Sequence, residues 1–360
     1  MSRVAVIAYN LGGPDSPAAV RPFLQNLFSD PMILRVPAPV RFFLARFIAW
    51  RRAPVAQEIY ARIGGRSPIL PETEKQAAAL QAALNDAEAA GAAAAAATDG
   101  AEYRVFVAMR YWHPFAGAVA REVAAWAPDR IVLLPLYPQF STTTTGSFSR
   151  VWKTAAADAG LGVPVAEICC WPEADGFVDT VARETAAAIG TLPAGAPYRV
   201  LFSAHGLPKK IVDAGDPYAD QVERTAAAVR ARLPALGIAG DPDTRVSYQS
   251  RVGPLEWLRP YTEDEIKSAG AAGLSLVVVP VAFVSEHSET LVELDIEYAE
   301  LAAEAGVLAY VRAPTVNADP AFIETLAALV RAAPESGVAP GLARGGSACG
   351  TGFADCPCRP

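Results

Sequence analysis

The sequence predicts an α/β protein with two doubly wound parallel-sheet domains. Short β-branched runs alternate with alanine-rich, helix-like stretches along most of the chain, and this alternation is typical of parallel sheets covered by helices on both faces. The length of 360 residues is enough for two domains that each bury a core. Hydrophobic residues make up 52% of the chain and charged residues 19%, a composition that excludes a disordered protein.

The elements can be assigned in order along the chain. The predicted strands share β-branched or aromatic runs bounded by turn residues; they are residues 4–9, 103–109, 130–136, 163–169, 198–203, 244–248, 274–283 and 307–311. The predicted helices share a helical spacing of apolar residues; they are residues 118–125, 177–189, 219–233 and 290–305. Residues 86–100 are nearly all alanine and glycine, and a surface insertion or helix extension without a functional role is expected there.

The chain is expected to divide into an N-terminal domain of residues 1–165, a C-terminal domain of residues 166–335 and a tail of residues 336–360. The tail is rich in glycine and proline, yet it holds three of the five cysteines. Ligands of doubly wound folds bind beyond the carboxyl ends of the strands. The cleft between the two halves is therefore the expected place for a site.

The net charge of the chain is -7, from 31 Lys+Arg against 38 Asp+Glu, so nucleic acid is not an expected partner. No apolar run reaches the ~18 residues of a membrane-spanning helix, and the first residues do not follow a signal-peptide pattern. A cytoplasmic protein is therefore expected. The glycine turn at residues 10–15 contains Pro14 and matches neither a Walker A nor a GxGxxG sequence, which disfavours a nucleotide enzyme.

His205 comes just after the predicted strand 198–203 and precedes Gly206. Sites of doubly wound folds lie at the carboxyl ends of strands, and imidazole is the side chain most often used for proton transfer near neutral pH. The position indicates a general base, and a structural histidine is the alternative.

A second constellation follows the predicted strand 274–283 and opens a helix, with Ser288 as the expected N-cap. Glu289, Glu293 and Glu297 recur at i, i+4 and i+8, and each such like-charge pair destabilises a helix by a few tenths of a kcal/mol. A bound cation would explain this stripe, and a solvated acidic face is the alternative. His287 beside the stripe favours a divalent transition metal. The expected core face is Leu291, Leu294, Tyr298 and Leu301.

A hydroxyl-rich turn lies at residues 141–147, between a predicted strand and a helix. Hydroxyl and backbone N–H groups at a helix N-terminus can bind carboxylates or phosphates. Helix capping accounts for one or two of these hydroxyls, but the turn has six, so capping alone does not explain the pattern.

Aromatic residues and arginines are interleaved in residues 36–54. This pattern suits a membrane surface or a large apolar ligand that carries carboxylates. The alternative is a helix packed on the protein's own core, with the arginines reaching outward.

The cysteines fall into two groups. Cys349, Cys356 and Cys358 lie in the tail, and the adjacent Cys169 and Cys170 end a predicted strand. One of the latter with the three tail cysteines would make an all-thiolate site, which fits an iron–sulfur cluster or, less well, zinc. Thiols without a ligand are the alternative.

With these residues in place, the sequence resembles the ferrochelatases, the family of the terminal enzyme of haem biosynthesis. The resemblance spans about residues 4 to 330 and includes the motifs MRYWHP at 109–114 and YQSRVGPLEW at 248–257. The other matching segments are residues 10–14, 23–31, 51–54, 57–68, 136–147, 203–208, 215–218 and 281–298. The resemblance implies two Rossmann-like, chelatase-like domains with a porphyrin cleft between them, and an active-site lip at about residues 23–54.

The resemblance also implies roles for individual residues. His205 and Glu289 match the catalytic pair. Positions that handle the metal or protons are matched by this pair and by His287, Glu293 and Glu297. The matches to substrate-binding positions are Leu11, Arg52, Tyr60, Ser67, Arg110, Tyr111, Tyr137 and Trp257.

The cysteine pattern resembles that of cluster-bearing bacterial members, in which a [2Fe–2S] cluster is held by three tail cysteines and one from an earlier strand. This implies Cys349, Cys356 and Cys358 with either Cys169 or Cys170 as ligands. Thr142 stands where the animal enzymes have a cluster cysteine instead.

The reaction implied is insertion of Fe²⁺ into protoporphyrin IX, giving protohaem and two protons. Insertion into coproporphyrin III is the close alternative, and a non-catalytic haem or metal carrier is the alternative of a different class. A cobalt chelatase is disfavoured because residues 57–68 follow the ferrochelatase pattern. Any membrane contact is expected to be peripheral, at the inner membrane face through the lip, and the resemblance leaves the oligomeric state open.

Overall fold

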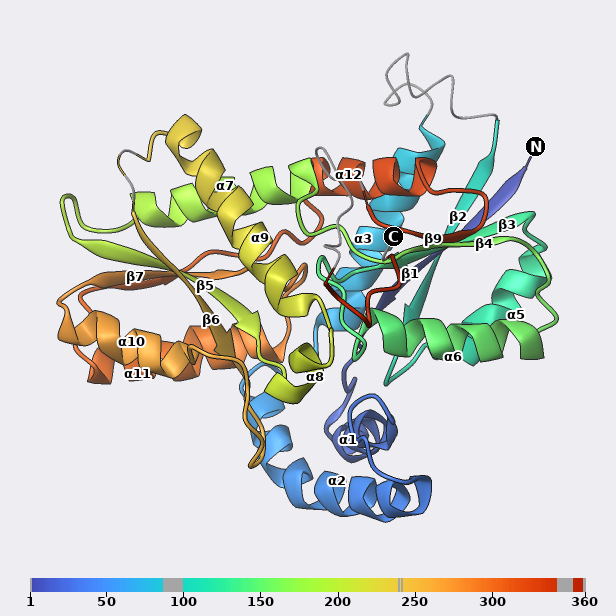
Figure 1. Cartoon of the computed structure of the whole chain (residues 1–360), viewed down its shortest axis with the longest axis horizontal. Coiled ribbons are helices and arrows are strands. Elements are labelled where there is room, and N and C mark those ends of the chain that lie inside the picture. The colour runs from blue at the N-terminus through green and yellow to red at the C-terminus, as the bar shows by residue number, and fades with distance from the viewer. Residues whose placement is uncertain (1, 87–99, 239, 241, 342–351, 359–360) are drawn as a thin grey trace. The chain divides into compact units, whose positions relative to one another are not determined.

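In the computed structural model, residues 2–86, 100–238, 240, 242–341 and 352–358 are described. The chain forms two compact units. The first consists of Met1–Cys170 and Leu326–Gly341, and the second of Trp171–Thr325 and Leu342–Pro360. Each unit is built around its own sheet (Figure 1).

The first unit holds a five-stranded sheet in the order β2-β1-β3-β4-β9, in which every neighbouring pair is parallel. β1 is buried from Val4 to its end, as expected for a strand with helices on both faces. The strands are β1 (Arg3–Asn10), β2 (Glu102–Met109), β3 (Arg130–Pro135), β4 (Val165–Ile168) and β9 (Gly337–Ala339).

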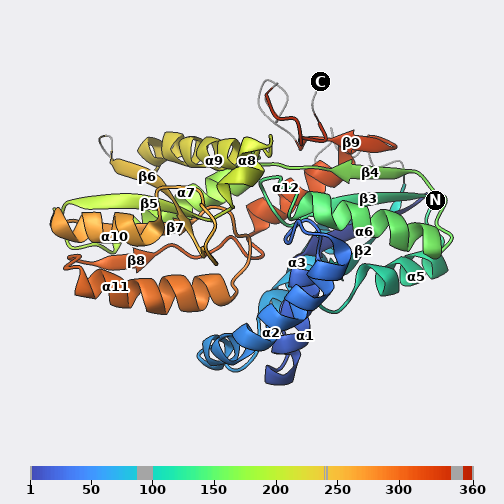
Figure 2. The same cartoon turned by 60° about the horizontal axis from the view of Figure 1, so that its bottom comes forward.

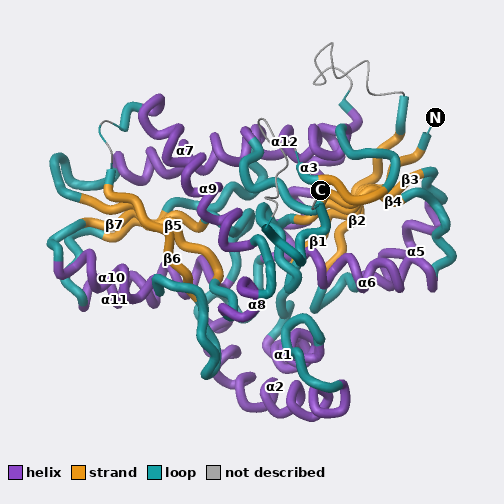
Figure 3. Tube along the Cα trace, viewed as in Figure 1, coloured by secondary structure: helices purple, strands orange, loops and turns teal. Residues whose placement is uncertain are grey.

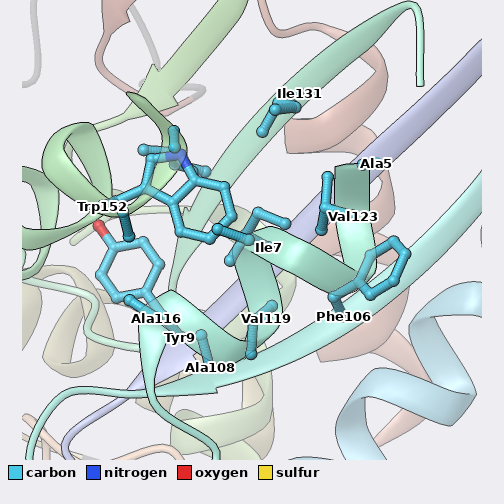
Figure 4. Close-up of a cluster of buried hydrophobic side chains, with 14 of the residues drawn as sticks. Ala5, Ile7, Tyr9, Phe106, Ala108, Ala116, Val119, Val123, Ile131 and Trp152 are labelled. Carbon is cyan, nitrogen blue, oxygen red and sulfur yellow. The ribbon is translucent and has the colours of Figure 1, made fainter. Parts of the chain in front are cut away.

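Two helices, α5 (Ala116–Trp126) and α6 (Thr145–Asp158), pack on one face of this sheet, and α3 (Ile69–Asn85) lies across the other face (Figure 1). Figure 4 shows the core between the sheet and the α5–α6 pair, with Tyr9 close to Trp152. The Tyr9 ring stacks on Phe148, with ring centroids 3.9 Å apart and an interplanar angle of 6°. Large apolar side chains thus fix the ends of β1 and α6 against each other.

Helices α1 (Val20–Ser29) and α2 (Ala38–Ala61) lie side by side and extend away from the sheet layers of the first unit (Figure 2). A 3-10 turn, Pro17–Ala19, leads into α1. α2 buries the small residues Ala45, Ala49 and Ala53. Four of its aromatic residues face outward instead: Phe42 is 50% exposed, Phe43 70%, Phe47 59% and Trp50 56%. α2 therefore packs on the protein's own core through its small residues, and these four aromatic side chains take no part in that packing.

The second unit holds a four-stranded parallel sheet in the order β6-β5-β7-β8. Its strands are β5 (Tyr198–His205), β6 (Asp243–Gln249), β7 (Ser275–Pro280) and β8 (Tyr310–Arg312). The helix pairs α7–α9 and α10–α11 cover opposite faces, so helix layers flank the strands (Figure 3). The helices are α7 (Asp175–Gly190), α8 (Lys209–Asp213), α9 (Tyr218–Arg232), α10 (Thr262–Ala271) and α11 (Tyr298–Glu304), with a 3-10 turn at Leu233–Leu236. The prediction of two doubly wound parallel sheets is confirmed.

Two local predictions need correction. The expected α-helix over residues 290–305 is a π-helix, Glu289–Glu297, followed by α11. Ser288 already has helical backbone angles, and its side chain makes no cap hydrogen bond. The Ser288 hydroxyl therefore cannot serve as the N-cap that the sequence predicted, because a cap residue is normally extended.

The boundary between the units also differs in detail from the expected domain limits. The expected break at residues 165/166 falls within β4, which pairs with β3 and β9, whereas the first unit runs to Cys170. α12 (Pro320–Arg331) begins in the second unit and ends in the first. Residues 337–339, expected in an irregular tail, form β9.

None of the helices in the described ranges is long and apolar enough to cross a membrane.

Candidate active site

The centre of the candidate site in the second unit is a contact between His205 and Glu289. His205 is the last residue of β5, and Glu289 is the first residue of the π-helix that follows β7. His205 Nδ1 lies 3.0 Å from Glu289 Oε2. Both side chains are half-buried, with 36% and 27% exposed. The carboxyl ends of two neighbouring strands therefore bring the pair together, as doubly wound folds do for their sites.

Each member of this pair stabilises the charged form of the other. Burial alone would raise the pKa of Glu289, but the charge of His205, its hydrogen bond and the nearby His287 hold that pKa at about 2. Burial works to lower the pKa of His205, but the Glu289 carboxylate, and then Glu293, raise it above its ordinary value. Because Glu289 contacts Nδ1, the Nε2 atom of His205 is the one left to exchange protons with a ligand.

His287 and Glu293 lie next to this pair. His287 Nε2 is 3.8 Å from Glu289 Oε2, and burial lowers the pKa of His287. Glu293 accepts hydrogen bonds from Ser250 N at 2.8 Å and from Gln249 Nε2 at 3.0 Å. The Ser250 hydroxyl also donates to it. Burial, and then the charge of Glu289, raise the pKa of Glu293.

Glu297 lies apart from these residues. Its side chain is exposed, and none of the described residues forms a hydrogen bond or ion pair with it. Within the described ranges, no group of three or more His, Cys, Asp or Glu side chains is arranged to hold a metal ion. The predicted five-residue ligand set is thus brought together in part, around Glu289, and its role with a metal stays a prediction.

Substitution of Glu289 by glutamine is expected to lower the pKa of His205. The carboxylate now favours the imidazolium and raises that pKa above 6.5. Its removal leaves the burial, which favours neutral imidazole. NMR titration of the imidazole ring protons measures this change, and the chain has only three histidines to assign. An unchanged pKa of His205 in Glu289→Gln would contradict the charge pairing.

Gly206 lets this strand end pack closely. A Cβ atom at this position would lie 3.0 Å from the Gln249 carbonyl oxygen and 3.2 Å from the Trp257 ring. Gly206 N donates to the same carbonyl at 2.8 Å. Close packing therefore requires a glycine beside His205, because any side chain there would push the end of β5 away from β6.

In the first unit, Arg110 and Tyr111 follow β2 and are held by a buried carboxylate, Asp30. Arg110 Nη2 and the Tyr111 hydroxyl each donate to Asp30 Oδ2 at 2.7 Å. The Ser147 hydroxyl donates to the same oxygen and accepts from Arg110 Nε at 2.7 Å. Burial, and then the charge of Asp30, raise the pKa of Tyr111. This hydroxyl therefore remains a donor at neutral pH.

Sequence reasoning did not select Asp30, whose side chain is only 1% exposed. The sequence does contain a feature that points to this residue, because Asp30 is the only charged residue in the segment FLQNLFSDP at 23–31. A lone carboxylate in an otherwise uncharged segment is seldom buried without a partner.

The other predicted substrate positions are distributed over both units. Ser67 is buried and accepts from Ile69 N at 3.3 Å, while Tyr60 is buried in the cluster between α1 and α2. Leu11 and Tyr137 are partly buried, and Arg52 is exposed on α2. Trp257, in the second unit, donates from its indole nitrogen to Val252 O at 3.1 Å.

The cysteines are also divided between the units. Cys169 and Cys170 are buried at the end of β4, with their sulfur atoms 3.4 Å apart. In the second unit, Cys356 is 2% exposed and Cys358 is partly buried. Cys349 lies outside the described residues.

An imidazole–carboxylate pair at the strand ends of a doubly wound α/β protein is the kind of site that can move protons or bind cations. A family model described as Ferrochelatase matches residues 3–333, and the chain belongs to this family. It is 50% identical over 359 residues to a protein named Ferrochelatase from Caulobacter vibrioides, covering 99% of this chain and 98% of that protein. It is 52% identical over 358 residues to the Ferrochelatase of Phenylobacterium zucineum, with the same coverage. Among solved structures, SirB from Bacillus subtilis with Fe3+ aligns at a TM-score of 0.49 and 12% identity, covering 92% of this chain and 95% of that chain.

Proposed function

We propose that the protein is a ferrochelatase that inserts Fe²⁺ into protoporphyrin IX, giving protohaem and two protons. The observation that carries this proposal is the His205–Glu289 pair at the end of β5, in a chain of the ferrochelatase family. Membership of that family supports a role in haem biosynthesis.

The chemistry of the pair suits this reaction. Metal insertion requires removal of two N–H protons from the porphyrin, and a base must reach them. With Nδ1 bound to Glu289, neutral His205 has Nε2 available to accept a proton. The neighbouring carboxylate then stabilises the imidazolium that forms. Imidazole and carboxylate groups are also suitable ligands for Fe²⁺, which is a substrate here.

The test is an anaerobic assay with Fe²⁺ in which the loss of free-porphyrin fluorescence is followed. Parallel reactions contain protoporphyrin IX and coproporphyrin III. Faster turnover of protoporphyrin IX is the expected result. Preference for coproporphyrin III would reassign the substrate and leave the chelatase activity standing, and no turnover of either would favour a haem or metal carrier.

We further propose a [2Fe–2S] cluster held by Cys349, Cys356, Cys358 and one of Cys169 and Cys170. Thiolate donors are the ligands that such clusters use. The burial of Cys356 supports a structural role for the segment that carries it. This segment packs tightly on the second unit, because a Cβ atom at Gly215, which has φ of +107°, would lie 2.7 Å from Ala354 N. When bound, the cluster would supply a cross-link between these cysteines.

The cluster proposal predicts a brown protein whose visible absorption bleaches with dithionite and is lost in Cys356→Ser. Single Cys169→Ser and Cys170→Ser variants serve as a matched pair, since only the ligand should abolish the absorption. A colourless protein with one tightly bound zinc would contradict the cluster.

We also propose that the protein acts in the cytoplasm and contacts the inner membrane face peripherally through α2. The exposed Phe42, Phe43, Phe47 and Trp50 support this, since they alternate with arginines. The double variant Phe43→Ser/Trp50→Ser is expected to reduce co-sedimentation with anionic vesicles. Equal sedimentation of variant and wild type would contradict the contact.

A further inference from the structure

A cavity of about 460 Å³ opens on the first unit, between α5, α6 and the chain that follows α1. Its size is within the ~300–1,000 Å³ range of small-molecule sites. Three guanidinium groups line it, from Arg110, Arg121 on α5 and Arg150 on α6. The cavity is defined entirely by residues of the first unit.

The positive charge in this cavity is only partly neutralised. The guanidinium groups of Arg121 and Arg150 form no hydrogen bond or ion pair with any described residue. Arg110 uses Nη2 and Nε for Asp30 and Ser147, and its Nη1 has no partner among the described residues. Of the two carboxylates in the lining, Asp30 is fully engaged by Arg110, Tyr111 and Ser147, and Asp158 stands at the far end of α6. Three arginines against two aspartates leave this pocket net positive in a chain whose total charge is -7.

The remaining lining is small or apolar. Val151, Ala155 and Ala159 form one wall along α6, and Pro31 contributes from the chain after α1. Gly117 contributes no side chain to the cavity near the start of α5, and the nearest atom to a Cβ added there is Arg121 Nη1 at 4.0 Å. The pocket therefore combines the unpaired guanidinium groups of Arg121 and Arg150 with space for a small molecule.

We propose that this pocket binds a small organic or inorganic anion through paired carboxylate or phosphate oxygens. Guanidinium groups present parallel N–H donors that match two oxygens of one carboxylate or phosphate group. The ligand would contact Arg110 as well as Arg121 and Arg150, so it would share one guanidinium with the Asp30 network. The proposal concerns binding alone and does not depend on the porphyrin reaction.

The test is calorimetric titration of the full-length protein with citrate and, separately, with pyrophosphate. The double variant Arg121→Gln/Arg150→Gln is expected to weaken binding of the preferred anion at least tenfold. Arg21→Gln/Arg104→Gln is the matched control, because it removes two exposed positive charges from the same unit away from the cavity. The control should bind within about twofold of wild type, an expectation based on the small effect of distant exposed charges. Binding of citrate alone would identify carboxylates as the ligand class, and binding of pyrophosphate alone would identify phosphates.

A second variant separates shape from charge. Gly117→Leu keeps every charge and fills the space beside Arg121, so it should also abolish binding while thermal stability is retained, because leucine is a better helix former than glycine. Equal weakening in the pocket and control variants would mean non-specific attraction and would overturn the proposal. So would the absence of saturable binding of either anion to the wild-type protein.

Discussion

Replacement of His205 by alanine is expected to lower kcat for porphyrin metallation by roughly 10² to 10⁴-fold, the usual contribution of a positioned acid–base group. The variant loses the only imidazole whose Nδ1 is held by Glu289, and alanine cannot accept the pyrrole protons. The side chain is 36% exposed, so only a small change in unfolding free energy is expected. Stopped-flow measurement of porphyrin fluorescence under anaerobic conditions gives kcat directly.

The matched control is His113→Ala. His113 is exposed and packs edge-on against Trp112 and Phe115, and no part of the proposed chemistry uses it. Its kcat should remain close to that of the wild type. A His205→Ala protein with wild-type kcat would show that His205 is not the base.

The largest stability effect is expected for Asp30→Asn. This change removes the charge that faces Arg110 in a site where the carboxylate is 1% exposed and the arginine 15%. Removal of one partner of a buried ion pair destabilises a protein by about 3–5 kcal/mol, because the other charge is left uncompensated. Urea denaturation should therefore show a lower midpoint for the unfolding of the first unit.

Asp129→Asn is the control for this experiment. Asp129 also accepts a hydrogen bond, from Arg3 N at 2.8 Å, but at an exposed position. Its loss should change the unfolding free energy by less than about 1 kcal/mol. Similar effects of the two variants would show that burial of the Asp30 network contributes nothing to stability.

The alternation of strands and helices was enough to predict both sheets, because long buried runs such as Val4–Asn10 fit few structures other than a central strand. β9 was not predicted because it has no such run of residues. It has three residues, with Val338 41% exposed, and its pairing with β4 depends on a segment far away in the sequence. No local pattern encodes such a partner.

In the candidate site, too, residues marked by a local sequence pattern could be predicted and the others could not. His205 was selected because it follows a recognisable strand, and Glu289 because of the spacing of the glutamates and the resemblance to the family. The π-helix was not foreseen, since its hydrogen bonds differ from those of an α-helix without a distinct side-chain pattern. Glu297 was grouped with Glu293 from spacing and from the resemblance, yet Glu297 is exposed and Glu293 is held by Gln249 and Ser250. Spacing predicts which side chains share a helix face, but tertiary packing decides which of them have hydrogen-bond partners.

The position of β9 also fixes the order in which the molecule can be completed during synthesis. Figure 1 shows β9, near the red end of the chain, beside the green β4. Domains usually fold as units as they leave the ribosome, but the first unit lacks its fifth strand until Trp171–Thr325 has also been translated. Until then β4 is an open edge, and unpaired edges invite pairing with other chains. The nascent protein therefore completes its first sheet only after most of the second unit has been made, and β4 can pair with other chains until then.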